Sequence, residues 1–179
     1  MIEDLSTSPL GPRLTTPDQW REHLDAHTAE AAAVGSRPDC RLGRAPATAE
    51  EVEQAERRLG LQVSLPPSYR AFLQVTNGWD DAGGWIESVD SLDELQWLCE
   101  YSGLYAEYCE ENDDEYSQLL GAALKVNHGP DFWLLCANEV RPDGEWSAYE
   151  FMPGLWQFTK VASFADLWHF HHSELRKAE

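Results

Sequence analysis

Thirteen carboxylate side chains fall between Arg70 and Lys125, a stretch that contains no lysine or arginine. They account for 13 of the 19 net negative charges of this 179-residue chain. Seven tryptophans and tyrosines lie among them, from Trp79 to Tyr116. Carboxylates can pair with lysine or arginine, and an aromatic ring can stack on a guanidinium plane. The pattern therefore indicates a surface that binds a basic protein, although a merely solvated acidic face has the same composition.

Within this stretch we predict a partner-binding surface in two parts, one in the run from Trp79 to Glu87 and one in the run from Glu110 to Glu115. The predicted contact residues are Trp79, Asp80, Asp81, Trp85, Glu87, Glu110, Glu111, Asp113, Asp114 and Glu115. The acids would steer the encounter, and the aromatic side chains would supply a desolvated anchor. Reversing Asp113, Asp114 and Glu115 to lysine is expected to slow association and to leave stability nearly unchanged.

The spacing of the residues supports no other chemistry. The run EENDDE has oxygen ligands for calcium, but Glu115 stands where an EF-hand loop needs glycine. His169, His171 and His172 lack the glutamate of H-E-x-x-H, and His171 would point away from the other two on a helix. No G-x-S-x-G, Walker or G-x-G-x-x-G motif is present. We therefore predict no catalytic site, metal or cofactor, and keep an acid-rich hydrolase as the contrasting alternative.

Cysteine usage and hydropathy predict a cytoplasmic protein. The four cysteines, Cys40, Cys99, Cys109 and Cys136, include no C-x-x-C pair and are interpreted as reduced thiols. No apolar run approaches the roughly 18 residues of a membrane span, and the first residues do not resemble a secretory leader. The net charge of -19 disfavours nucleic acid and anionic membranes as partners.

The stretch LPPSYRAFLQVTNGW, residues 65–79, predicts a short helix around which the fold is organised. Its two prolines suit a first turn, where a missing N–H costs nothing. Apolar side chains recur at helical spacing up to Thr76, and Asn77 and Gly78 predict its end. We assign to the fold, rather than to binding, the residues Leu65, Tyr69, Phe72, Gly78 and Trp133.

The remaining elements predict a single α+β domain whose mostly antiparallel, mixed sheet is flanked by helices. Helices are predicted over 16–33, over 48–59, from Ser91 with a break near Gly103 and a continuation to Leu119, and after Ser163. Strands are predicted over 85–89, 124–126, 132–136, 146–151 and 156–161. Residues 1–14 are predicted to be a loose arm and 35–46 a linker, so we divide the chain into an N-terminal arm with an add-on helix, 1–45, and the α+β domain, 46–179.

Three segments resemble the SUKH superfamily (Smi/Knr type). They are TAEEVEQAERRLGLQVSLPPSYRAFLQVTNGW at 48–79, FWLLCANEVRPDGEWSAYEF at 132–151 and VASFADLW at 161–168. The resemblance implies a SUKH-like fold and a bacterial immunity protein that binds and neutralises a cognate toxin, often a nuclease or a nucleic-acid deaminase. Because such a toxin needs a basic cleft for phosphate, the acidic surface would dock there and block it. The family's fungal members imply the alternative, a regulatory or scaffold protein without a toxin partner.

Overall fold

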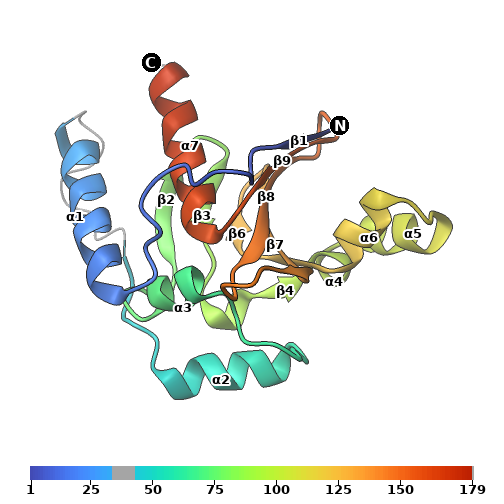
Figure 1. Cartoon of the computed structure of the whole chain (residues 1–179), viewed down its shortest axis with the longest axis horizontal. Helices are drawn as coiled ribbons and strands as arrows, with labels where there is room; N and C mark the ends of the chain where they lie inside the picture. Colours follow the sequence, from blue (N-terminus) through green and yellow to red (C-terminus); the bar gives the residue numbers. More distant parts are fainter. Residues whose placement is uncertain (34–42, 179) are drawn as a thin grey trace.

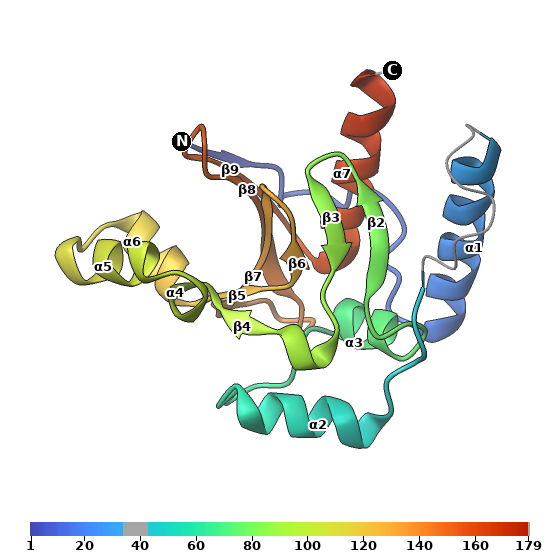
Figure 2. The same cartoon turned by 180° about the vertical axis from the view of Figure 1, so that it is seen from behind.

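The computed structural model describes residues 1–33 and 43–178. They form an α+β fold in which helices cover both faces of a six-stranded sheet, as Figure 1 and, from behind, Figure 2 show. In the order in which they lie side by side, its strands are β1 (Ile2–Asp4), β9 (Gln157–Val161), β8 (Trp146–Met152), β7 (Phe132–Val140), β5 (Ala123–Lys125) and β4 (Gln96–Trp97). Only β1 and β9 pair in parallel. The predicted fold class is confirmed.

A second sheet joins the first where the chain crosses between them. Its strands, in spatial order, are β2 (Trp79–Gly83), β3 (Ile86–Val89) and β6 (Asn127–His128). At the crossing, the N–H of Val126 donates to the Trp133 carbonyl (3.1 Å), and the Val126 carbonyl accepts from the Asp90 N–H (2.9 Å). One residue therefore holds the two sheets together through its own backbone groups.

The helices lie on opposite sides of the large sheet. α3 and α7 pack on one face with α1 outside them, and α4, α5 and α6 cover the other face (Figure 1). The bounds are α1 (Pro17–Ala33), α2 (Ala49–Arg58), α3 (Pro67–Leu73), the short 3-10 helix η1 (Leu92–Glu94), α4 (Leu98–Tyr101), α5 (Gly103–Glu111), α6 (Glu115–Gly121) and α7 (Phe164–Ala178).

Across the residues that the structure describes, none of the helices combines the length and the apolar character that a membrane span requires.

Strand β7 separates the hydrophobic core into two halves. Its side chains alternate between the faces of the sheet, as those of any strand do. Trp133 and Leu135 pack into the half that contains α3 and α7. Phe132 and Leu134 pack into the half that contains the helices α4 to α6. The prediction that this apolar run forms a strand covered on both faces is confirmed.

The organising helix α3 is shorter than predicted. Tyr69 and Phe72 are fully buried, as the apolar stripe predicts. The helix ends at Leu73, however, and the Val75 N–H donates to the Phe72 carbonyl three residues earlier (2.9 Å), a tighter turn than that of an α-helix. The end predicted at Asn77 and Gly78 is therefore wrong by about one turn.

Residues before 45 contribute to both the sheet and the core. Ile2 pairs with Phe158 in the parallel ladder of β1 and β9, so the prediction of a loose arm is wrong at this point. On α1, Trp20 is fully buried and its indole N–H donates to the Ser68 carbonyl at 2.8 Å. The division of the chain at residue 45 stays a prediction. Cys40 and most of the predicted linker, 35–46, lie outside the described residues.

Two local signals had different outcomes. The capping box of Thr48 and Glu51 is present at the start of α2, as predicted. The box of Ser91 and Glu94 also forms, but it opens only η1, because Leu95 adopts an extended conformation and leads into β4. The strand β2 was not predicted.

Candidate functional site

The β2–β3 hairpin carries the first group of predicted contact residues. Its two strands are antiparallel, with a shift of register between Asp80 and Gly83. Asp81 lies within this shift with a φ of 60°, a conformation that aspartate adopts more readily than most residues. Gly84 and Trp85 then close the hairpin. Trp85 is thereby placed at the tip of the hairpin.

Trp85 is exposed, but its backbone is held in place. The side chain is 67% exposed. Its carbonyl accepts a hydrogen bond from the Asp131 N–H at 3.4 Å. Gly129 approaches so closely that a Cβ there would lie 2.2 Å from the same carbonyl oxygen. A large apolar side chain that stays in water loses the roughly 1.5 to 3 kcal/mol of stabilisation that its burial would contribute. A large aromatic side chain that projects from a fixed backbone is suited to anchor a partner.

The other residues of this group have three different environments. Asp81 and Glu87 are exposed and form no ion pair with any part of the chain that the structure describes. Asp80 is also exposed, but it is ion-paired. Trp79 is only 5% exposed, and its ring lies against that of Trp168 with 6.1 Å between the centroids. The prediction of Trp79 as a contact residue is therefore wrong, because it belongs to the core.

The second group of predicted residues lies elsewhere on the molecule. Glu110, Glu111, Asp113 and Glu115 are exposed at the junction of α5 and α6. In Figures 1 and 2 this junction is at one edge of the molecule, well separated from the β2–β3 hairpin. The predicted residues therefore form two separate surfaces.

Asp114 has a structural role within the second group. One of its carboxylate oxygens accepts from the Ser117 N–H (2.8 Å) and so caps α6, and the other accepts from the Tyr108 hydroxyl (2.8 Å). The N–H of Ser117 holds the pKa of Asp114 below its usual range. Reversing Asp113, Asp114 and Glu115 together would remove this cap as well as the charge. Reversals that test the surface should therefore leave Asp114 in place.

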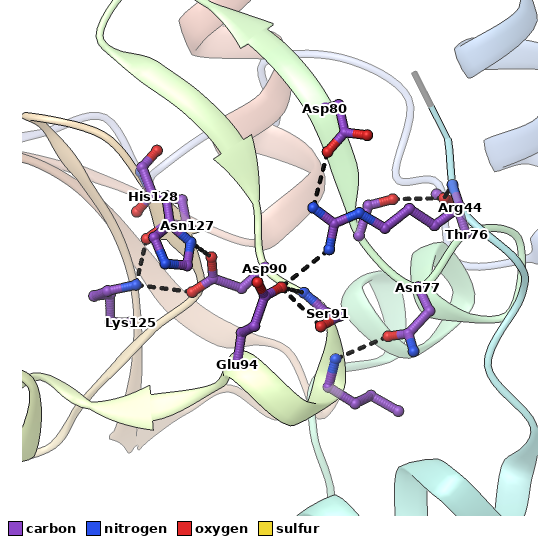
Figure 3. A network of polar contacts seen from close by, with 12 residues as sticks. Arg44, Thr76, Asn77, Asp80, Asp90, Ser91, Glu94, Lys125, Asn127 and His128 are labelled. Carbon is purple, nitrogen blue, oxygen red and sulfur yellow. Dashed lines mark hydrogen bonds and ion pairs between the residues drawn. The ribbon is translucent and has the colours of Figure 1, made fainter. Parts of the chain in front are cut away.

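Arg44 is a counter-ion of Asp80 and Glu94 that was not predicted from the sequence. Its guanidinium donates to Asp80 (2.8 Å) and to Glu94 (3.0 Å), as Figure 3 shows. The backbone of Arg44 is placed by its N–H, which donates to the Thr76 hydroxyl at 2.7 Å. Asn77 accepts the N–H that begins η1, at 2.8 Å. Thr76 was predicted only as part of the apolar stripe and Asn77 only as the end of the helix, but together they position both sides of this network.

Glu94 is held ionised by its neighbours. The Ser91 N–H (2.8 Å) and hydroxyl (2.7 Å) both donate to the oxygen that Arg44 also contacts. Burial raises the pKa of Glu94, but the hydrogen bonds from Ser91 and Arg44 outweigh it and hold the pKa at about 2. The carboxylate thus fastens η1 to residue 44.

We expect Glu94 to contribute to the pH dependence of stability. Because its pKa in the folded protein is depressed from 4.5 to about 2, its contribution is present above pH 4.5 and is lost as the pH falls toward 2. The side chain is 40% exposed, so solvent screening limits the contribution to about 1 kcal/mol. In urea titrations, Glu94→Gln should lower the free energy of unfolding at pH 7 by that amount and flatten its fall between pH 4.5 and 2.

The exposed Glu111→Gln is the matched control, since it removes the same charge without touching Arg44. Equal pH profiles for the Glu94→Gln and Glu111→Gln variants would contradict this role of Glu94.

A second network lies at the crossing between the sheets. Asp90 and Lys125 are both fully buried, with 2.8 Å between Nζ and Oδ2. His128 contacts the other oxygen of Asp90, and Lys125 also donates to the Asn127 carbonyl (Figure 3). The Lys125 ammonium lies 4.9 Å from the centre of the Tyr101 ring. Burial raises the pKa of Asp90, and Lys125 offsets part of this effect.

The two networks change the interpretation of the acidic stretch. By its sequence, this stretch is a run of thirteen acids without local counter-ions. Within the described residues, Asp80, Asp90 and Glu94 have cationic partners, which come from outside that stretch. In the described ranges, the charge without a cationic partner therefore lies on the other ten acids of the stretch. Two of them are in the hairpin, five are at the α5–α6 junction, and the remaining three are Asp93, Glu100 and Glu107.

A cavity of about 420 Å³ lies where residues 6–15 meet α7 and the β7–β8 turn. Two buried carboxylates line it. Glu145 accepts from the N–H and the hydroxyl of Ser68, at 2.8 Å each, and so caps α3. Asp166 accepts from the Leu10 N–H at 2.7 Å. Burial raises the pKa of Glu145. Both carboxylates thus have structural roles in the contacts that define this cavity.

The C-terminal histidines also make structural contacts. His169 lies 2.8 Å from the Pro12 carbonyl. His171 lies 2.9 Å from both Glu150 and the Gly83 carbonyl, so it links α7 to the hairpin. In the ranges 1–33 and 43–178, no group of three or more histidine, cysteine, aspartate or glutamate residues is arranged to hold a metal ion.

Comparison with known proteins gives one family. The model of the SMI1 / KNR4 family (SUKH-1) matches residues 46–168. None of the curated proteins matches the chain. The matched range contains the β2–β3 hairpin, the α5–α6 junction and the Lys125 network.

Proposed function

The chain belongs to the SMI1 / KNR4 family (SUKH-1), and from this premise we propose that it is a non-catalytic binding protein. Its proposed role is that of an immunity protein, which binds and neutralises a cognate toxin in the cytoplasm. The toxin would be a basic protein that acts on nucleic acid.

The observation that carries the proposal is the exposure of Trp85 on a fixed backbone. Tryptophan is among the residues that contribute most to binding when a partner buries them. The backbone of Trp85 is held by Gly129 and by the Asp131 N–H, so little backbone conformational entropy remains to be lost on binding. Asp81 and Glu87, both exposed, lie on the same hairpin. This combination of ring and carboxylates suits an arginine or lysine of the partner.

The acids of the α5–α6 junction have a different role in this proposal. They lie away from the hairpin, so they act through their field rather than through contact with the same partner residues. A field of one sign speeds the encounter with an oppositely charged protein and weakens with salt. A toxin that holds phosphates in a basic cleft is such a protein. Docking of the hairpin at that cleft would exclude the nucleic acid.

The test compares Trp85→Ala with Leu155→Ala, which shortens a similarly exposed side chain at the β8–β9 turn, 71% exposed. The full chain is used to recover a partner from its host, and the affinity is then measured by titration. Trp85→Ala should weaken binding by about 2 kcal/mol, roughly 30-fold, while unfolding changes by less than about 0.5 kcal/mol. Leu155→Ala should bind like the wild type.

Co-expression with the recovered partner tests the immunity role itself. The wild type should restore growth of cells that express the partner, and Trp85→Ala should restore it less well. Wild-type affinity of Trp85→Ala would exclude the hairpin as the anchor. A partner that binds but does not harm cells would instead favour the regulatory alternative.

A further inference from the structure

Two cysteines lie together between α4, α5 and α6. The Sγ atoms of Cys99 and Cys109 are 3.7 Å apart. Both side chains are half-buried, whereas Cys136 is fully buried in the core. From the sequence, these cysteines are predicted to be reduced thiols. Their proximity was not predictable from a spacing of ten residues that spans a helix break.

We propose that Cys99 and Cys109 form an oxidisable dithiol, which a small-molecule disulfide such as oxidised glutathione converts into an intramolecular disulfide. This modification site goes beyond the proposed function and does not depend on it.

The position of the two sulfur atoms favours the reaction. A disulfide bond of about 2.05 Å requires them to approach by roughly 1.7 Å, which side-chain rotation and a small shift of α4 can supply. α4 has only four residues and is followed by Ser102 in an extended conformation. Because the helix is so short, it offers little resistance to a small shift. Among the described residues, the other hydrogen-bond partner of each thiol is a backbone carbonyl, that of Leu120 for Cys99 (3.6 Å) and that of Ser117 for Cys109 (3.4 Å). Thiols are weak donors, so these contacts cost little to lose.

The chemistry requires two successive exchanges. The thiolate of one cysteine attacks a sulfur of oxidised glutathione, forms a mixed disulfide and releases one glutathione thiolate. The other cysteine loses its proton to solvent and attacks the protein sulfur of the mixed disulfide, which releases the second glutathione. The two protein thiols thus lose two protons and two electrons in total, and the glutathione disulfide takes them up to become two thiols.

The reaction should be slow at neutral pH. Burial, together with the neighbouring Cys109, raises the pKa of Cys99 to about 12, and only the thiolate is a nucleophile. Oxidation should therefore be faster at pH 9 than at pH 7. The product would tie α4 to α5, the helix that carries Glu110 and Glu111.

The test uses peptide mapping of the folded, full-length Cys40→Ser variant. Trypsin leaves both cysteines in one peptide, because no lysine or arginine lies between Arg70 and Lys125. A glutamate-specific protease cuts between them, at Glu100 and Glu107. After incubation with oxidised glutathione and alkylation, we expect cross-linked peptides, a protein mass reduced by two hydrogens and the loss of both alkylation sites.

Single variants separate the disulfide from simple glutathione addition. Cys99→Ser and Cys109→Ser should gain at most a glutathione adduct at the remaining cysteine and give no cross-linked peptide. The proposal would be overturned if the folded Cys40→Ser variant carried glutathione at Cys99 or Cys109 and gave no cross-linked peptide. Retention of both alkylation sites in the folded protein when the same protein cross-links in urea would also overturn it.

Discussion

Replacing Tyr69 with alanine should lower the free energy of unfolding by about 3 to 5 kcal/mol, the range found when a large aromatic side chain leaves a core. Tyr69 is fully buried on α3, next to aromatic rings of α3 itself and of α7. Its ring centroid is 4.7 Å from that of Phe164 and 6.2 Å from that of Phe72. These neighbours belong to rigid helices and cannot fill the space that the substitution leaves. Urea unfolding followed by tryptophan fluorescence measures the loss.

Tyr69→Phe is the matched control for this prediction. Within the described part of the chain, the Tyr69 hydroxyl has no hydrogen-bond partner. Removing it therefore costs no hydrogen bond and relieves a buried polar group. We expect Tyr69→Phe to be neutral or slightly stabilising. A loss above about 1 kcal/mol in Tyr69→Phe would show that the hydroxyl is bonded, and a small loss in Tyr69→Ala would contradict the central role of this ring.

Replacing Asp90 with asparagine should cost about 3 to 5 kcal/mol, because it leaves the charge of Lys125 buried without its counter-ion. Both side chains are fully buried, and the pair lies beside Val126, where the two sheets meet. The remaining contacts of Lys125 with the Asn127 carbonyl and the Tyr101 ring do not neutralise the ammonium. Thermal and urea unfolding of the purified variant give the loss directly.

The double variant Asp90→Asn with Lys125→Met separates charge from packing. It removes both charges while keeping similar side-chain volumes, so no isolated charge is left buried. The double variant should therefore regain most of the stability that Asp90→Asn loses. If it is as unstable as the single variant, the loss comes from the contact between Asp90 and His128 rather than from the isolated ammonium.

Where local signals agreed with one another, the sequence predicted the structure. The capping box at Thr48, the apolar run from Phe132 and the break near Gly103 all appear as predicted. Each depends on interactions within a few residues: a side chain on a nearby N–H, alternation along a strand, or a helix interruption. The residues assigned to the fold, among them Leu65 and Trp133, are buried accordingly.

The failures occur where pairing with another strand overrides local preference. β2 contains Asp80, Asp81 and Gly83, which are poor strand formers, and pairing with β3 makes it a strand. The box at Ser91 predicts a helix, but pairing of Gln96 with Lys125 draws the chain into an extended strand after one turn. Composition alone cannot predict either pairing.

The family, the α+β class, the buried aromatic stripe of α3 and the excess of acidic side chains are predictable from the chain alone, because they follow from short-range pattern and composition. Which acids are neutralised and which tryptophan is exposed depends on the folded arrangement. Arg44 and Lys125 pair with acids that are distant from them in the sequence. The hydrophobic core buries Trp79, whereas Trp85 stays exposed on a backbone that Gly129 holds in place. Burial and counter-ions are set by contacts between segments far apart in the chain, and such contacts have no local signal in the sequence.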